Sequence, residues 1–221
     1  MILFSNFTPN CATNCCINNL KNFKMKRTGI IVLIVIVVLV FWGFQWGIST
    51  GNKMVTMDEG VATAWSQVEN VYQRRSDLIP NLVSTVKGYA DFEKSTLTAV
   101  IEARAKATQV TVDPSKLTQA SLQQFQQAQG GLSSALGRLM VVVEKYPELK
   151  ANEGFMNLQA QLEGTENRIT VERQKFNEVA RGYNTYIRQF PQSIIASMRK
   201  FEKKAYFEAE KGADKAPKVQ F

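Results

Sequence analysis

The chain has 221 residues, 45% of them hydrophobic and 21% charged, which is enough for one folded domain with a buried core. The formal charge of +8 does not indicate a nucleic-acid partner, because five basic residues precede the first acidic residue, Asp58, and from Asp58 onward 22 basic residues stand against 19 acidic ones. Histidine is absent, which excludes Ser-His and Cys-His triads, His-containing zinc sites and the Glu-x-x-His di-iron site of helical bundles, so we expect no cofactor.

Residues 1–24 contain all three cysteines of the chain and show no apolar periodicity. We expect this extension to be disordered or to precede the true start of translation. Met25-Lys-Arg resembles the basic opening of a membrane-targeting segment, so Met25 is the expected start. Because no cysteine follows, no disulfide framework is predicted for the rest of the chain.

Residues 25–51 are predicted to anchor the chain in a membrane. The nineteen residues from Gly29 to Gly47 include one polar side chain, Gln45. As a helix rising about 1.5 Å per residue, this stretch just crosses the hydrocarbon layer. A cleaved signal peptide is the alternative, but the apolar core is longer than usual for one and no small-x-small cleavage site follows it.

The residues that flank this stretch predict its orientation. Trp42 and Trp46 lie at its C-terminal end, where indole rings prefer the membrane interface, and three basic residues precede it whereas Lys53 alone follows closely. The positive-inside rule therefore predicts a single-pass protein of the cell (inner) membrane. Its N-terminus would be cytoplasmic and its main domain extracytoplasmic.

Three glycines spaced by four residues, Gly43, Gly47 and Gly51, form a small-xxx-small pattern at the end of this segment. Such a pattern lets two membrane helices approach closely, so a homo-oligomer through these glycines is one interpretation. The alternative is that glycine is simply common in membrane helices.

Residues 52–191 are predicted to form an antiparallel bundle of four main helices. Apolar residues recur at steps of three and four from Met54 onward, and the first helix is expected to continue unbroken from the membrane segment. It is predicted to end at Ser76–Pro80, with Pro80 in the first turn of the second helix.

The loop around Val110–Pro114 is predicted to separate the second and third helices, with Ser115 as the next N-cap. Pro147 is expected to end the third helix and Pro191 the fourth. Short connections between long helices with a narrow apolar seam are typical of an antiparallel bundle. Residues 192–208 are predicted to form an amphipathic helix, and residues 209–221 a disordered tail.

Four blocks of this sequence resemble the LemA family: RRSDLIPNLVSTVKGYADFEKSTL, EARAKA, VVVEKYPELKANEGFMNLQAQLEGTENRI and ERQKFNEVARGYNTYIRQFP. The resemblance implies an N-terminal membrane helix followed by a long helical bundle, and it implies no established biochemical activity. Two features depart from the family pattern. These are the cysteine-bearing extension and Ser76, which stands where an aromatic residue is usual.

Five polar residues fall on the predicted apolar stripes. A buried charge costs several kcal/mol unless it is paired, so we expect these residues to fix helix register or to lie at the edge of the seam. The alternative is a bundle enzyme that uses a carboxylate-bound metal or a Glu/Arg pair. The five are Glu93, Arg104, Gln129, Thr165 and Glu172.

Two turns rich in polar residues are predicted to bind a partner protein. If the third helix runs away from the membrane, the turn after the first helix and the turn after the third share one end of the bundle. Ordinary solvation is the alternative explanation. The predicted partner-binding residues are Arg74, Arg75, Asp77, Asn81, Lys87, Glu144, Tyr146, Lys150 and Asn152.

A second surface is predicted at the opposite end of the bundle. Arg199, Lys200, Lys203 and Lys204 alternate with apolar residues, which is typical of a segment that lies on lipid headgroups. Together these observations predict a membrane-anchored, non-enzymatic helical scaffold or binding module of the bacterial envelope. Its partners would be the lipid bilayer and another envelope protein.

Overall fold

The computed structural model describes residues 27–88 and 93–208, and within these ranges the chain forms helices and no β-strand. This confirms the all-α fold class. The chain divides into two compact units, Met1–Gly47 and Ile48–Phe221. Each unit is described by itself.

The first unit consists, in its described part, of the beginning of helix α1 (Arg27–Lys87). Its apolar side chains are exposed on every side of the helix, from Ile30 through Phe44. The most apolar 18-residue window of α1 has a mean hydropathy of 2.6, and none of it is buried. A helix that is apolar all round and uncovered by protein is typical of a membrane span.

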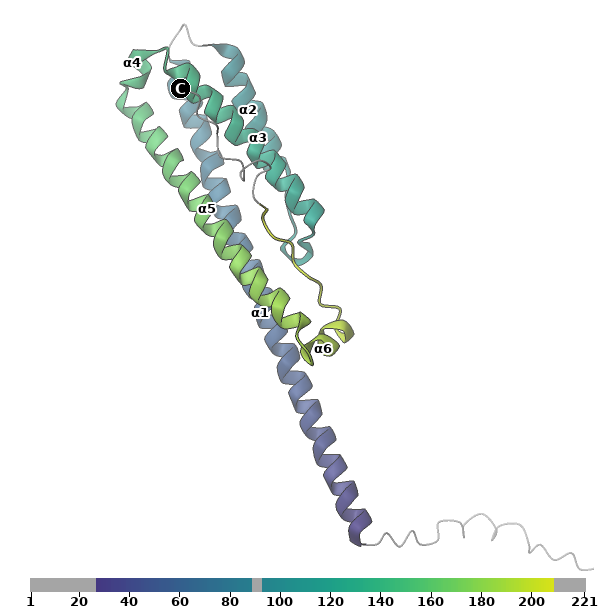
Figure 1. Cartoon of the computed structure of the whole chain (residues 1–221). Coiled ribbons are helices and arrows are strands. Elements are labelled where there is room, and N and C mark those ends of the chain that lie inside the picture. Colours follow the sequence, from purple (N-terminus) through teal and green to yellow (C-terminus); the bar gives the residue numbers. More distant parts are fainter. Residues whose placement is uncertain (1–26, 89–92, 209–221) are drawn as a thin grey trace, which may run out of the picture. The chain divides into compact units, whose positions relative to one another are not determined.

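The second unit is built from the rest of α1 and the helices that fold back along it. Figure 1 shows α2 and α3 side by side, with α4 at the end where α1 and α2 meet. Helix α5 runs antiparallel to α1, because the start of α5 packs near the end of α1 and the end of α5 near Met54. The remaining elements are α2 (Lys94–Gln109), η1 (Pro114–Lys116), α3 (Gln119–Val143), α4 (Pro147–Lys150), α5 (Glu153–Arg188) and α6 (Gln192–Met198).

The core of the second unit has two parts. One lies around the turns and joins Val86 of α1, Leu139 of α3 and Phe155 of α5. The other part is aromatic and centres on Trp65. Both Trp65 and Phe176, which belongs to the same part, are fully buried. Each such side chain contributes about 1.5–3 kcal/mol on burial, so the two parts account for why these long helices stay together.

Helix α1 passes through Pro80 and ends at Lys87, so the predicted end at Ser76–Pro80 is wrong. Proline has no N–H and cannot bond the carbonyl four residues back, which here is that of Ser76. That carbonyl instead accepts a hydrogen bond from Arg104 Nε of α2 at 2.8 Å. Arg104 of α2 therefore satisfies the Ser76 carbonyl that Pro80 leaves without an N–H, and α1 continues through the proline.

The predicted cap at Ser115 is also wrong. Asp113 caps the short helix η1, accepting hydrogen bonds from the Ser115 backbone N–H at 2.8 Å and from its hydroxyl at 2.7 Å. These bonds lower the pKa of Asp113 below its ordinary value. Helix α3 begins one turn later with a capping box between Thr118 and Ser121.

The C-terminal part differs from the predicted helix over 192–208. Helix α6 stops at Met198, Lys200 adopts a left-handed backbone with φ of 58°, and residues 201–208 form no helix. Asparagine side chains of α5 bind the main chain of this segment, which gives its backbone partners other than its own helix turns. The predicted disordered regions 1–24 and 209–221 lie outside the described residues.

Candidate functional site

The turns that follow α1 and α3 lie at the same end of the second unit. Val86 before the first turn, Leu97 after it, Val143 before the second and Phe155 after it belong to one hydrophobic cluster. Figure 1 shows this end, where α4 lies between the end of α3 and the start of α5. The first turn is, however, the one between Lys87 and Lys94, two helical turns beyond the position predicted from Pro80.

Arg75 is not a surface residue, and its predicted role in partner binding is wrong. Its side chain is 2% exposed and its guanidinium crosses to α3 and α5. It donates to Glu166 Oε2 and Ser133 Oγ, both at 2.9 Å, and to Gln129 Oε1 at 2.7 Å. A guanidinium buried with this many acceptors ties three helices together.

The other predicted partner-binding residues differ in their surroundings. Asn152 is the N-cap of α5 and accepts a hydrogen bond from the Phe155 backbone N–H at 3.0 Å. Tyr146 packs against the core. Lys150 forms an ion pair with Glu144, and both side chains are more than half exposed, so the pair adds little stability. The exposed members on α1 are Arg74, Asp77, Asn81 and Lys87.

The polar residues on the predicted apolar stripes do not share one site. Glu93 is exposed and accepts a hydrogen bond from Ser95, and Glu172 pairs with Lys175. Gln129 and Thr165 are buried, as the stripes predict. Among residues 27–88 and 93–208, no three His, Cys, Asp or Glu side chains gather closely enough to hold a metal ion.

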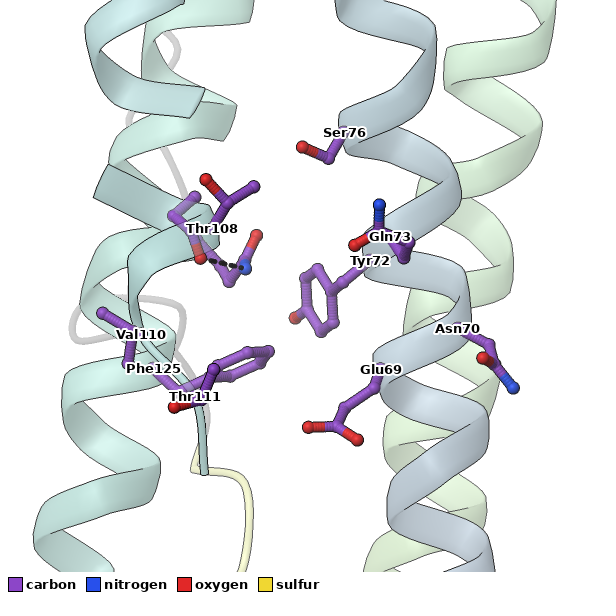
Figure 2. Close-up of a pocket in the computed structure, with 11 residues that line it drawn as sticks. Glu69, Asn70, Tyr72, Gln73, Ser76, Thr108, Val110, Thr111 and Phe125 are labelled. Atoms are coloured by element: carbon purple, nitrogen blue, oxygen red, sulfur yellow. Dashed lines mark hydrogen bonds between the residues drawn. The ribbon is translucent and has the colours of Figure 1, made fainter. Parts of the chain in front are cut away.

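A pocket of about 330 Å³ opens between α1, α2 and α3. Figure 2 shows the Tyr72 ring and the Glu69 carboxylate directed from α1 toward Phe125 and the segment after α2. Tyr72 meets Phe125 edge-on, with ring centroids 5.0 Å apart. The full lining is Glu69, Asn70, Tyr72, Gln73, Ser76, Ala107, Thr108, Val110, Thr111, Phe125 and Gln129.

The polar groups of this pocket suit hydrogen bonding. The buried Ser76 hydroxyl has no hydrogen-bond partner among the described residues. Burial raises the pKa of Tyr72, although Arg173 and Arg75 act to lower it, so the hydroxyl stays neutral near pH 7. Sequence reasoning missed this pocket because Phe125 and Gln129 belong to the predicted stripe of the third helix, and spacing alone gives no signal that Glu69 and Tyr72 of α1 face them.

The C-terminal segment 201–208 lies against α5, α3, η1 and Leu117, which follows η1. Asn184 accepts from the Lys204 backbone N–H at 2.9 Å and donates to its carbonyl at 2.8 Å. Asn177 makes the same two bonds with Phe207, at 2.8 and 3.0 Å. The Ala205 N–H donates to the Leu117 carbonyl at 3.1 Å.

Lys204 was predicted to lie at the membrane interface, and this is wrong because the residue is 8% exposed. Its ammonium lies 2.9 Å from Asp58 Oδ1 and 3.0 Å from the Ser115 carbonyl. Nearby, burial and the Asp58 carboxylate raise the pKa of Tyr183 well above its ordinary value.

The other predicted interface residues are exposed. Arg199, Lys200 and Lys203 are exposed in the second unit, and in the first unit Trp42 is 71% and Trp46 36% exposed.

The glycine pattern is only partly available for contact with another anchor. Gly43 has open space around it. Gly51 is buried, and a side chain there would collide with the Arg199 guanidinium. Gly51 therefore packs within the second unit, and an oligomer through the three glycines stays a prediction.

A long apolar helix joined to an all-helical bundle defines a membrane protein of the helical-bundle class. The LemA family model matches residues 64–221, and the chain belongs to the LemA family. This agrees with the family resemblance of the sequence blocks.

Three relatives show how far the similarity extends. Magnetosome protein MamQ 2 of Paramagnetospirillum magneticum and magnetosome protein MamQ of Magnetospirillum gryphiswaldense are each 28% identical, over 74% of this chain. The chain spans 66% of the length of these MamQ relatives. Protein LemA of Metamycoplasma hominis is 23% identical over 72% of this chain and 68% of its own length.

Proposed function

We propose that this chain is a membrane-anchored, non-enzymatic scaffold of the bacterial envelope that binds another protein at the turn end of its second unit. The single observation that carries the proposal is the convergence of the two turns at one end. There Val141, in the last turn of α3, is 68% exposed, and Met156, in the first turn of α5, is 48% exposed. Exposed apolar side chains among charged neighbours are typical of a docking patch.

We call this patch the end surface and define it by Lys87, Val141, Glu144, Lys150 and Met156. All five residues are exposed. Arg75 and Asn152 are left out because both hold the bundle together. The exposed α1 residues Arg74, Asp77 and Asn81 extend the surface along one helix.

The membrane side of the proposal rests on sequence and on similarity. The basic residues before the apolar stretch favour a cytoplasmic N-terminus and an extracytoplasmic bundle in the inner membrane. Arg199, Lys200 and Lys203 are exposed in the second unit, and their alternation with apolar residues favours binding to lipid headgroups. The MamQ relatives carry the name of the magnetosome, and their names specify no reaction.

Site-specific photocrosslinking in cells tests the end surface. A photoreactive amino acid at position 141 or 156 should give one shared protein adduct. The same residue at exposed position 174 on α5 should not give it. Val141→Asp should remove the adduct and leave the thermal melt unchanged. Identical adducts from all three positions would contradict the proposal.

A second candidate, a bundle enzyme, is favoured only by the pocket beside Tyr72. Its Glu69 carboxylate, Tyr72 hydroxyl and unpartnered Ser76 hydroxyl could bind a small polar molecule. Metal analysis of the purified chain, with thermal melts with and without chelator, tests the metal-dependent form of this idea. A stoichiometric metal whose removal lowers the melting temperature would favour it.

A further inference from the structure

The second unit holds its own C-terminal segment as a binding groove holds a peptide. Asn177 and Asn184 are seven residues apart on α5, which places them on one face of the helix two turns apart. Each binds both the N–H and the carbonyl of one residue of the segment. These main-chain groups are the same in every residue except proline, so the two clamps recognise an extended backbone rather than particular side chains.

Two side-chain pockets add sequence preference to the clamps. The Lys204 ammonium is met by the Asp58 carboxylate and lies 5.9 Å from the centre of the Tyr183 ring. The Phe207 ring stacks on Trp65 at 5.9 Å and meets Phe176 edge-on at 5.4 Å. The groove therefore fits an extended segment with lysine three residues before phenylalanine.

The connection to this segment is short and locally strained. It consists of the seven-residue helix α6 and Lys200, whose φ of 58° is disfavoured for any residue with a side chain. A short strained hinge favours exchange of a terminal segment between copies, since the same contacts are remade and the hinge relaxes. Copies anchored in one membrane would also meet at high local concentration.

We propose that this groove is a peptide-binding site that accepts the segment 201–208 of a second copy of the chain, so that two copies exchange their C-terminal segments. The argument for this occupant is that the segment already fits both clamps and both pockets. The exchange is separate from the end surface and does not depend on the proposed scaffold function.

Disulfide crosslinking of mixed chains tests the exchange. All variants carry serine in place of Cys11, Cys15 and Cys16. Full-length chains with Gln119→Cys and with Glu208→Cys are reconstituted together in vesicles, because these two side chains are hydrogen-bonded at 2.7 Å. Oxidation should give a covalent dimer of one chain of each kind. Arg138→Cys, exposed on α3, replaces Gln119→Cys as the matched control and should give none.

The hinge gives an independent readout. Lys200→Gly removes the penalty for the left-handed backbone in a chain that binds its own segment 201–208. It therefore stabilises this unexchanged state and should lower the yield of mixed dimer roughly fivefold or more. Lys200→Ala, which removes the ammonium but keeps the penalty that a side chain brings to this backbone, should not lower it. An equal yield with and without Lys200→Gly would overturn the role of the hinge.

A labelled peptide separates the groove from the exchange. The peptide KFEKKAYFE should bind full-length chain carrying Phe207→Ala, and the peptide with alanine at both the Lys204 and the Phe207 positions should bind at least tenfold more weakly. Asn177→Ala with Asn184→Ala should abolish binding of the first peptide. Peptide binding without a mixed dimer would overturn exchange between copies. Absence of both the mixed dimer and peptide binding would overturn the whole proposal.

Discussion

Replacing Arg75 with alanine should destabilise the second unit by about 3–5 kcal/mol, because it leaves a buried acceptor without its donor and a cavity in place of a fully buried side chain. The guanidinium donates to three side chains, and its loss leaves the buried Gln129 amide oxygen without a donor. An unsatisfied buried acceptor costs about 1–3 kcal/mol by itself. The Glu166 side chain is 53% exposed and can return to water, so its part of the loss is small.

Thermal unfolding of the full chain in detergent, followed by circular dichroism at a helix band, measures this loss. At about 2–4 °C per kcal/mol for a domain of this size, the melting temperature should fall by roughly 6–20 °C. Arg74→Ala is the matched control, because Arg74 is the exposed neighbour, and should change stability by less than about 0.5 kcal/mol. Equal melting temperatures for the two variants would refute the assignment of Arg75 as a core residue.

Three further outcomes follow from the contacts of the second unit. Asn184→Ala should speed amide hydrogen exchange at Lys204, measured by mass spectrometry, whereas Glu178→Ala on the exposed face of α5 should not. Because the pKa of Tyr183 is raised in the folded state, its contribution to the free energy of unfolding is complete below pH of about 10, the unfolded pKa, and is lost as pH rises above that value. Tyr183→Phe should therefore reduce the fall of the urea midpoint at alkaline pH. The lowered pKa of Asp113 has the opposite sign: its stabilisation is present above pH of about 4 and is lost as pH falls further, and Asp113→Asn should weaken that acid dependence.

The order and number of the long helices could be predicted because apolar spacing reports directly on burial. Leu122, Phe125, Leu132 and Leu139 of the predicted third helix are all buried in α3. The end of α1 could not be predicted in the same way. Proline is a reliable sign of a helix start or end only where no other group can satisfy the carbonyl that it frees, and the group that does so, Arg104, is on another helix.

The candidate site was predicted less well, because a charged residue in sequence is read as exposed unless its partners are known. Arg75 and Lys204 are both buried, and their acceptors come from positions far along the chain. The segment 201–208 has the spacing of an amphipathic helix, yet the clamps of Asn177 and Asn184 hold it extended. Tertiary contacts of this kind override local periodicity and leave no local signal.

The pair of Pro80 and Arg104 allows a test of how α1 and α2 are joined. In the native chain, Arg104→Ala should cost about 1.5–3 kcal/mol, because the Ser76 carbonyl loses a charged donor in a half-buried place. Pro80→Ala restores an N–H that can bond the same carbonyl within α1, so the carbonyl no longer depends on α2.

A double-mutant cycle on urea unfolding measures this dependence. In the Pro80→Ala background, Arg104→Ala should cost at least about 1 kcal/mol less than in the native chain, which is the coupling expected for two groups that share one partner. Arg104→Lys should recover part of the native stability in the proline background only. If the two costs of Arg104→Ala are the same, then Arg104 acts through some other contact, and the continuity of α1 across Pro80 does not depend on α2.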